Sequence, residues 1–488
     1  MTALEHPARR ADGPGRPPAR VPFPVVDEVS RHCLQEEEPE TVHIEVHLPG
    51  TPDPARLKAA FAEALRRHPR ILMREARGPW YRRRYEWELT AEPDTEVVTF
   101  PAPEPDALKR ARERALAKAP SLAASPPIRL EVVAAEAGLA SRPEPGPDTA
   151  AGPGSVLFLT VNHTALDGPA CMRVLATAAE IYAGEGGSPA PVAPPPTRAP
   201  ERPGTAAQPP PDAPSGWAPP ARVLRGTPEP SPGNGLLVDE LPVPRRPKGS
   251  PFTVNDQLMV ATALMISHWN REHGARPRPL RITMPVDDRP RDATMPIGNG
   301  TRLVEVPFGA AELAHREWTP DAIHDLLRRT SDRTRALKAL PRPQLGHGAR
   351  LLTAPVLPVT LRAAVTRGLR RAAAPWTSTT LLSNIGRVPY PLDFGDAGRA
   401  HAVWFSAPAR LPRGLTVTTA STAGRLHVAL RWSKTLLGPG DGAHLRDLFE
   451  HYLHATEQTE RPARTERTER AGSGGPDPAP PGKSGGPK

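Results

Sequence analysis

Cysteine is almost absent from this chain, which has only Cys33 and Cys171 among its 488 residues. Two cysteines so far apart exclude a disulfide framework and the paired spacing of a zinc or redox site. No apolar run approaches the roughly 18 residues that a membrane-spanning helix needs, and the polar, proline-rich N-terminus lacks the apolar core of a signal peptide. We therefore expect a cytoplasmic protein without a membrane span.

Aromatic residues are also scarce, at 5% of the chain, although the formal net charge is +10. Proteins that bind nucleic acid usually set basic residues among aromatic ones, and no such stripe occurs here. We therefore expect no nucleic-acid partner. The positive charge can instead serve a phosphate-bearing substrate or an acidic partner protein.

Proline is the residue in excess, with 67 residues in the chain, or about 14% against a usual 5% or so. It gathers in stretches that are poor in large apolar residues and are therefore expected to be disordered: 1–21, 138–154, 184–235 and 460–488. The length also exceeds that of one usual core. The sequence thus predicts a disordered N-terminus (1–21), a first folded unit (22–183), a proline-rich linker (184–235), a second folded unit (236–455) and a disordered tail (456–488).

Both units have mixed α/β (α+β) patterning. In the first, Thr41 to Leu48 alternates apolar and polar residues, which predicts a strand with one buried face. Asp53-Pro54 supplies an N-cap and a proline at the first position of a helix that ends at His68-Pro69. The remaining elements expected in this unit are a helix at 106–119, two hairpin strands at 128–133 and 155–161, and a helix at 170–183.

In the second unit, Thr253-Val-Asn-Asp256 resembles a capping box and starts a helix that ends near Gly274. A hairpin is expected around Ala423-Gly424. The full set of expected elements is strands at 280–285 and 302–306, helices at 319–340 and 357–373, hairpin strands at 415–421 and 426–432, and a last amphipathic helix at 442–454.

The most informative segment is 155–168, Ser-Val-Leu-Phe-Leu-Thr-Val-Asn-His-Thr-Ala-Leu-Asp-Gly. Its apolar run predicts a buried strand, so His163 lies where a rigid strand gives way to a loop that is open to substrate. Gly168 allows a sharp turn, and Pro169 starts the next helix. The segment therefore presents a histidine at a usual place for a catalytic side chain.

His163 and Asp167 allow several interpretations. They can be purely structural, with the histidine bonded to backbone and the aspartate capping the next helix. A metal site lacks further ligands, since no H-E-x-x-H or C-x-x-C motif is present, and a Ser-His-Asp hydrolase would need a G-x-S-x-G turn. The remaining interpretation is a histidine general base in acyl transfer from a thioester, where one proton must leave an amine or alcohol.

Asn162-His163-x-x-x-Asp167-Gly168 resembles the H-H-x-x-x-D-G motif of the condensation-domain and chloramphenicol-acetyltransferase-like acyltransferase superfamily. The resemblance covers about residues 22 to 455, and Asn162 departs from it by replacing the first histidine of the motif. Four other features follow the order found in that superfamily: the strand and helix from Thr41 to Pro69, the helix start at Thr253, Met284-Pro-Val-Asp-Asp-Arg289 followed by Gly298-Asn299, and Leu382-Ser-Asn-Ile-Gly386.

The resemblance implies two similar lobes, each a mixed sheet with helices, that meet at a tunnel. His163 would lie in the tunnel as the general base or as the group that positions the nucleophile. Asp167 and Arg289 would form a structural ion pair, Gly168 would let the backbone approach the thioester, and Asn162 would be structural. Ser383 and Asn384 would lie on the segment that crosses between the lobes. The resemblance implies no metal and no permanently bound cofactor.

The predicted function is that of a freestanding, monomeric acyltransferase that joins an acyl group to an amine or alcohol in natural-product (nonribosomal peptide or polyketide) or lipid biosynthesis. The donor would be a phosphopantetheine thioester on coenzyme A or on an acyl or peptidyl carrier protein. The alternative is a catalytically silent condensation-like protein that recruits partner enzymes. A cyclising variant fits less well, because those resemble D-x-x-x-x-D at the position where this chain has Asn162.

Overall fold

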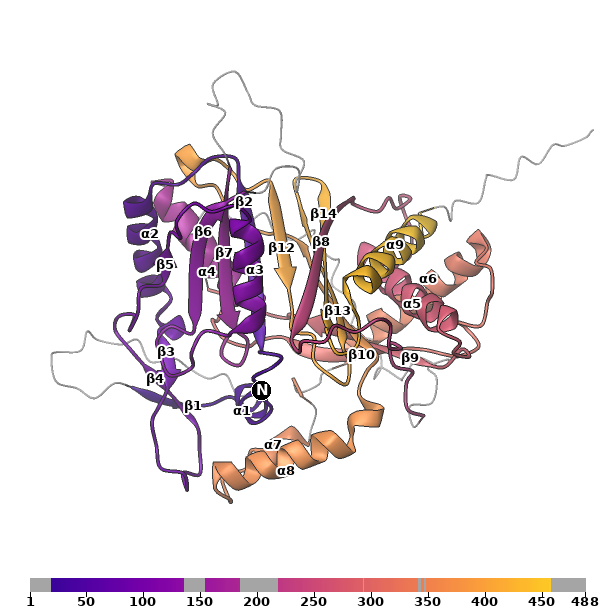
Figure 1. Cartoon of the computed structure of the whole chain (residues 1–488), viewed down its shortest axis with the longest axis horizontal. Coiled ribbons are helices and arrows are strands. Elements are labelled where there is room, and N and C mark those ends of the chain that lie inside the picture. The colour runs from indigo at the N-terminus through magenta and orange to yellow at the C-terminus, as the bar shows by residue number, and fades with distance from the viewer. Residues whose placement is uncertain are drawn as a thin grey trace, which may run out of the picture.

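The computed structural model describes residues 19–135, 154–184, 218–292, 294–340, 344–345 and 348–457. The stretches expected to be disordered, at 1–21, 138–154, 184–235 and 456–488, lie wholly or largely outside these residues. The described residues form two large sheets that stand side by side, each with its own helices, and a smaller third sheet (Figure 1). The expected mixed α/β fold with two lobes is therefore confirmed.

The first lobe is a five-stranded sheet in the order β12-β2-β7-β6-β5. Two helices that contact each other, α2 and α4, cover one face, while α3 covers the other (Figure 1). The elements are β2 (Thr41–Leu48), α2 (Pro54–Arg67), β5 (Val98–Thr99), α3 (Ala107–Ala117), β6 (Ile128–Ala134), β7 (Ser155–Asn162), α4 (Gly168–Tyr182) and β12 (Ala402–Ser406).

The second lobe is a six-stranded sheet in the order β10-β9-β11-β13-β14-β8. Helices α5 and α9 pack against each other, and α6 packs beside α5. The elements are β8 (Asn234–Pro242), α5 (Val254–Glu272), β9 (Leu280–Val286), β10 (Arg302–Phe308), α6 (Pro320–Ala339), β11 (Thr380–Arg387), β13 (Leu415–Thr422), β14 (Arg425–Ser433) and α9 (Pro439–Ala455).

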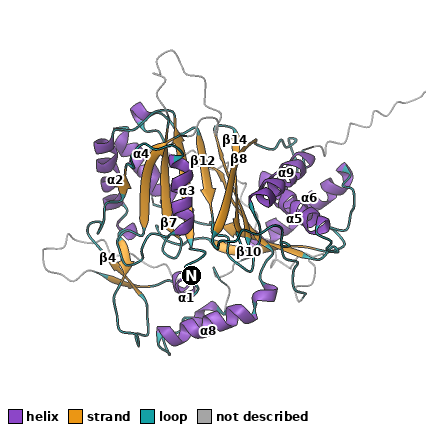
Figure 2. Ribbon diagram, viewed as in Figure 1, coloured by secondary structure: helices purple, strands orange, loops and turns teal. Residues whose placement is uncertain are grey.

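Smaller elements complete the molecule below the two sheets as they are drawn in Figures 1 and 2. A three-stranded sheet has the order β1-β4-β3. Its strands and the neighbouring helices are β1 (Arg20–Pro22), α1 (Val25–His32), η1 (Pro69–Ile71), β3 (Met73–Glu75), β4 (Glu86–Leu89), α7 (Ala349–Leu352), α8 (Val359–Ala372) and η2 (Ala374–Trp376). The short helix η3 (Gly395–Ala397) lies apart from them, beside the start of α2 and the end of α4.

Several local signals act as the sequence predicts. The α5 helix begins with the capping box of Thr253 and Asp256, and β6 pairs with β7 as an antiparallel hairpin. Between β13 and β14, Ala423 and Gly424 both have a positive φ, at 50° and 79°, as the tight two-residue hairpin turns require. These features depend on residues that are close in sequence, so the pattern alone identifies them.

The prediction of one solvent-facing side for Thr41–Leu48 is wrong, because both faces of β2 are buried. On the polar face, Arg112 of α3 binds Glu45 with both guanidinium arms, at 2.9 and 2.7 Å. Burial alone would raise the pKa of Glu45, but Arg112 holds it well below its usual range. Glu45 is thus paired with Arg112 of the helix that covers this face, whereas the alternating pattern predicts contact with water.

The second half of the chain also lends a strand to the first lobe. β12 pairs with β2, from Ala402 opposite His47 to Ser406 opposite His43. Trp404 of this strand packs between His47 and His427, with ring centroids 4.8 and 4.7 Å away. The chain therefore does not divide into two lobes at residues 184–235, as the sequence suggests, because 236–455 contributes strands to both sheets.

Three buried histidines make stability depend on pH. Burial lowers the pKa of His43 to about 3 and that of His68 and His427 to about 4. In the unfolded chain these rings bind protons below a pH of about 6.5, so acid favours unfolding. Asp27 acts in the opposite direction, because burial raises its pKa to about 7 and the folded state then binds the extra proton.

We expect the free energy of unfolding to fall by roughly 2 kcal/mol per pH unit between pH 6 and 5, since three histidines outweigh one carboxyl. Chemical denaturation at pH 7, 6 and 5 measures this slope. His43→Leu should reduce the slope by about half. A stability that is constant or rises on acidification would contradict this assignment.

Candidate active site

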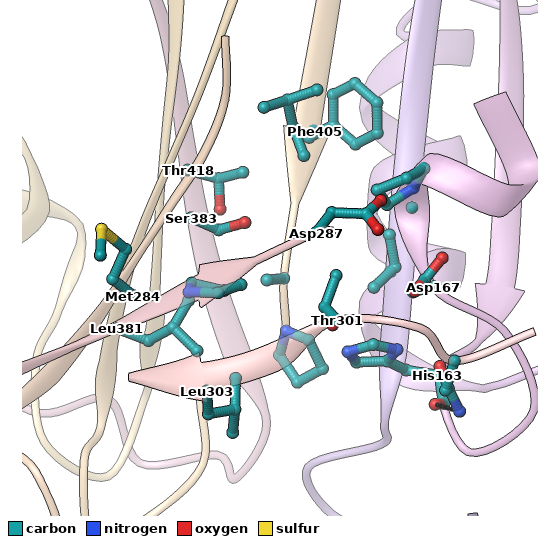
Figure 3. Close-up of a pocket in the computed structure, with 18 of the residues that line it drawn as sticks. His163, Asp167, Met284, Asp287, Thr301, Leu303, Leu381, Ser383, Phe405 and Thr418 are labelled. Carbon is teal, nitrogen blue, oxygen red and sulfur yellow. Dashed lines mark hydrogen bonds between the residues drawn. The ribbon is translucent and has the colours of Figure 1, made fainter. Parts of the chain in front are cut away.

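A cavity of about 670 Å³ lies between the two lobes, a volume within the usual range for small-molecule sites. The first lobe contributes His163, Asp167 and Gly168 to its wall. The second sheet contributes Met284, Leu303, Leu381, Ser383 and Thr418, and β12 contributes Phe405 (Figure 3). The histidine singled out from the sequence therefore opens onto a largely apolar space that both lobes build.

His163 stands directly after β7 and is fixed through its backbone and its ring. Its backbone N–H donates to the carbonyl of Glu40 at 2.8 Å, and Nδ1 lies 2.9 Å from the carbonyl oxygen of Leu166. A carbonyl can only accept, so Nδ1 carries the proton and Nε2 of the neutral ring keeps a lone pair. Figure 3 shows the imidazole beside Thr301 of the second lobe. In the neutral ring, Nε2 is therefore the nitrogen that can accept a proton.

Asn162 turns away from this space and organises the loop. Its Nδ2 donates to the carbonyl of Pro120 at 2.8 Å, and its Oδ1 accepts from the backbone N–H of Thr164 at 3.1 Å. The side chain is buried and is not part of the cavity wall. At this position the amide holds the His163 loop against the segment before β6.

Asp167 and Arg289, which are 122 residues apart in sequence, are brought together across the lobes, with Nη2 2.6 Å from Oδ2. Asp287 binds the same guanidinium at 2.8 and 3.0 Å. Burial alone would lower the pKa of Arg289, but these two carboxylates raise it above its ordinary value. Two carboxylates face one guanidinium, which leaves an excess of negative charge. The backbone N–H groups of Ala170, at the start of α4, and of Gly300 offset this excess by donating hydrogen bonds to Asp167.

Gly168 and Gly300 both make room for a neighbour in this cluster. A Cβ on Gly168 would lie 3.1 Å from the ring of Phe405, and one on Gly300 would lie 2.2 Å from Nε of Arg289. Gly168 belongs to the motif that the sequence displays, whereas nothing in the sequence distinguishes Gly300. Only the fold shows that the arginine lies over the last residue of the Gly298-Asn299-Gly300 segment.

Gly300→Ala is expected to destabilise the protein by about 1 to 3 kcal/mol, because the added methyl group displaces the Arg289 guanidinium. Gly440→Ala in α9 is the matched control, since nothing lies within 4 Å of its Cβ position. Thermal and urea unfolding of both variants measures the difference. Equal stability of the two variants would show that Arg289 adjusts freely.

Asn299 is a second residue whose role the sequence does not reveal. Its Nδ2 lies 3.2 Å from the carbonyl of His163, 3.0 Å from that of Thr164 and 2.9 Å from Oδ1 of Asp27. Trp87 donates to the other oxygen of Asp27. The amide therefore connects the His163 loop, the second lobe and α1.

The expectation that Ser383 and Asn384 lie on the segment that crosses between the lobes is wrong. They lie in β11, an inner strand of the second sheet paired with β13, and both contribute to the cavity wall. The strand that crosses is β12, which is short and pairs only with a distant part of the chain. No group of His, Cys, Asp or Glu in the described part of the chain is arranged to hold a metal ion.

No protein-family model matches the sequence. The first condensation domain of the CDA synthetase superposes with a TM-score of 0.57 at 14% identity, covering 90% of this chain and 97% of that one. The chain has the condensation-domain fold. The TRI3 trichothecene 15-O-acetyltransferase from Fusarium sporotrichioides also shares this condensation fold, with a TM-score of 0.57, 11% identity and coverage of 90% and 95%.

A further condensation fold is the starter condensation domain of rhizomide synthetase RzmA, solved in complex with C8-CoA and Leu-SNAC. It has a TM-score of 0.54, 14% identity and coverage of 89% and 93%. In sequence, the chain is similar to the uncharacterized protein Rv2305 of Mycobacterium tuberculosis H37Rv, at 28% identity in an alignment of 412 positions that covers 76% of this chain and 84% of that one. The fold that the resemblance implies is thus confirmed.

Proposed function

We propose that this protein is an acyltransferase that moves an acyl group from a phosphopantetheine thioester to an amine or an alcohol, in natural-product or lipid biosynthesis. The observation that carries the proposal is the 2.9 Å approach of His163 Nδ1 to the carbonyl oxygen of Leu166. The Nδ1–H is committed to that carbonyl, and the ring lies in a cavity shared by both lobes. Nε2 is therefore available to accept a proton from a bound nucleophile.

The chemistry balances without any further reagent. The nucleophile attacks the thioester carbonyl while Nε2 of His163 takes its proton; the C–S bond then breaks, and the thiolate recovers the proton as the thiol. The thioester is already activated, so no covalent enzyme intermediate is required. A positioned base contributes typically about 10² to 10⁴ in rate.

Cationic side chains at the same cavity support a phosphate-bearing donor. Arg370 and Arg413 both contribute to its wall, and among the described residues neither forms an ion pair. Burial, together with the nearby Arg370 and Arg410, lowers the pKa of Arg413 to about 10. Its guanidinium has a hydroxyl partner, Ser378, at 2.8 Å. A phosphate group of the donor, bound beside Arg370 and Arg413, would supply the negative charge that pairs with these guanidinium groups.

The test is an acyl-transfer assay with a panel of acyl-CoA and acyl-carrier donors against amine and alcohol acceptors, measuring thiol release and product mass. We expect thiol release that depends on His163. If no donor, with any acceptor or with water, gives more thiol than the His163→Ala variant, the protein is not an acyltransferase of this kind. The alternative, a silent condensation-like protein that recruits partner enzymes, would then be preferred.

Arg413→Gln sharpens this assay. It should raise the KM for acyl-CoA about ten- to a hundredfold, as expected for the loss of one charged hydrogen bond. The same acyl group on N-acetylcysteamine has no phosphate and serves as the matched control, so its KM should not change. An equal effect on both donors would show that Arg413 shapes the cavity and does not bind phosphate.

A further inference from the structure

Helix α8 has its polar side turned inward and its apolar side turned outward. The residues it buries include Arg362 and Thr366. Arg362 is ion-paired with Glu28 of α1 at 2.7 Å and donates to the carbonyl of Arg83 at 2.5 Å. On the opposite side, Leu361, Val365 and Leu369 are 48%, 43% and 51% exposed. A surface helix of a globular protein usually has the reverse arrangement.

The exposed stripe is continuous along the helix. Leu361, Val365 and Leu369 recur every four residues, and the other positions on that side of the helix are Ala364, Gly368 and Ala372. No side chain on this face can form a hydrogen bond. Arg367 and Arg371 flank it at the borders. The face is therefore apolar at its centre and cationic at its edge.

Neighbouring segments extend this apolar surface. The loop between β3 and β4 reaches the start of α8, where the backbone N–H of Val359 donates to the carbonyl of Arg82 at 2.9 Å. That loop carries Trp80 and Tyr81, which are 75% and 60% exposed. We call the whole surface the α8 patch: Trp80, Tyr81, Leu351, Val356, Leu357, Leu361, Val365, Leu369 and Trp376.

The α8 patch collects nearly all of the exposed large apolar side chains in the described part of the chain; Leu303 and Leu411 are the others. Figure 1 shows α7 and α8 together along the lower edge of the molecule, with the loop between β3 and β4 beside them. Single exposed apolar residues are common on protein surfaces, but a contiguous group of this kind marks an interaction site.

The charge of the segment points to the nature of the partner. Between Asp332 and Asp393 the sequence contains no Asp or Glu, and Arg350 of α7 and Arg367 and Arg371 of α8 are exposed there. A second copy of so cationic a surface would be repelled, because like charges would face each other. A protein interface also usually carries about one hydrogen bond per 100 to 200 Å², and the centre of the α8 face offers no side-chain donor or acceptor.

We propose that the α8 patch docks this protein on an anionic lipid surface. Its leucines would enter the boundary between headgroups and acyl chains, as the apolar face of an interfacial helix does. Trp80, Tyr81 and Trp376 match the aromatic residues that prefer the headgroup level, and the arginines match anionic headgroups. No helix in the described ranges is long and apolar enough to cross a membrane, so the contact is with the surface.

The patch lies close to the wall of the cavity. Arg370 of α8, as well as Val29 and Ser30 of α1, contribute to the cavity wall, and α1 packs against α8. Docking would therefore bring this side of the cavity close to the lipid surface, which would suit a lipid-soluble substrate. The binding itself is independent of the proposed acyl transfer, so each can fail without the other.

The experiment is co-sedimentation of the full chain with vesicles of equal parts phosphatidylglycerol and phosphatidylcholine, and with vesicles of phosphatidylcholine alone. We expect binding to the anionic vesicles that weakens as salt is added. Leu361→Ser with Leu369→Ser should weaken it roughly tenfold or more, since two apolar side chains lose their burial. Arg371→Gln should weaken it roughly fivefold, whereas Lys109→Gln, an exposed control on α3, should not.

The substituted leucines are exposed, so the melting temperature of the double variant should match that of the parent. Absence of binding to anionic vesicles, or equal binding by the double variant, would overturn the proposal. A dimer in analytical ultracentrifugation that the double variant abolishes would assign the patch to a second copy of the chain. Loss of binding to an acidic carrier protein, with vesicle binding unchanged, would assign it to that protein.

Discussion

His163→Ala is expected to lower kcat by about 10² to 10⁴-fold without changing the melting temperature. The variant removes the base at Nε2 together with the bond from Nδ1 to Leu166. The other hydrogen bonds that hold the loop remain. The backbone N–H of residue 163 still donates to the carbonyl of Glu40, and Asn299 still donates to the carbonyl of residue 163. Steady-state kinetics and a melting curve measure the two quantities separately.

A second variant separates chemistry from loop geometry. His163→Gln can still donate a hydrogen bond to the Leu166 carbonyl but cannot accept a proton near neutral pH. If His163 is the base, the glutamine variant should be as inactive as the alanine variant. Recovery of activity with glutamine would instead mean that the ring serves only to hold the loop. Unchanged product formation by His163→Ala would remove the histidine from the chemistry altogether.

Short-range signals predict the elements around the site well. The N-cap of α5, the hairpin turn at Ala423-Gly424 and the strand that ends at Asn162 each depend on residues within a few positions of one another. A capping box or a left-handed turn has the same requirement in any fold. For this reason the place of His163, at the end of a buried strand, follows from the sequence alone.

What the sequence cannot supply is which side of an element is covered. The alternation in Thr41–Leu48 predicts two different faces, but Glu45 is buried by Arg112, a residue 67 positions away. In α8, the apolar stripe that includes Leu361 and Val365 faces solvent, and the side that packs against the protein carries Arg362. Contacts between distant segments decide both cases, and no local pattern encodes them.

The same distinction between local patterns and long-range contacts applies to the residues of the site. Asp167 and Arg289 can be paired in advance because the resemblance to a known motif carries the pairing, although 122 residues separate them. Asp287, Asn299 and Gly300 cannot be given roles from the sequence, because each acts through a close approach that exists only in the folded chain. A glycine that makes room for a guanidinium looks in sequence like any loop glycine.

The two partners of the central ion pair should not be equivalent when they are removed. Asp167→Ala deletes the cap of α4 and one partner of Arg289, but Asp287 still neutralises the guanidinium. Arg289→Ala leaves both Asp167 and Asp287 buried without their cation. Breaking a buried pair costs about 3 to 5 kcal/mol, most of it from the charge that is left behind. We therefore expect about 3 kcal/mol for Asp167→Ala and about 5 kcal/mol for Arg289→Ala.

Asp53→Ala is the matched control for the cap, because Asp53 caps α2 at 2.7 Å in the same way but has no buried ion pair among the described residues. It should cost only about 1 kcal/mol. Urea denaturation of the three single variants and of the Asp167→Ala, Arg289→Ala double variant measures the order and the coupling. The double variant should be more stable than the sum of its two single losses predicts, because the residues share one network. Unaltered unfolding of Asp167→Ala, or a greater loss there than in Arg289→Ala, would mean that the pair does not hold the two lobes together at the His163 loop.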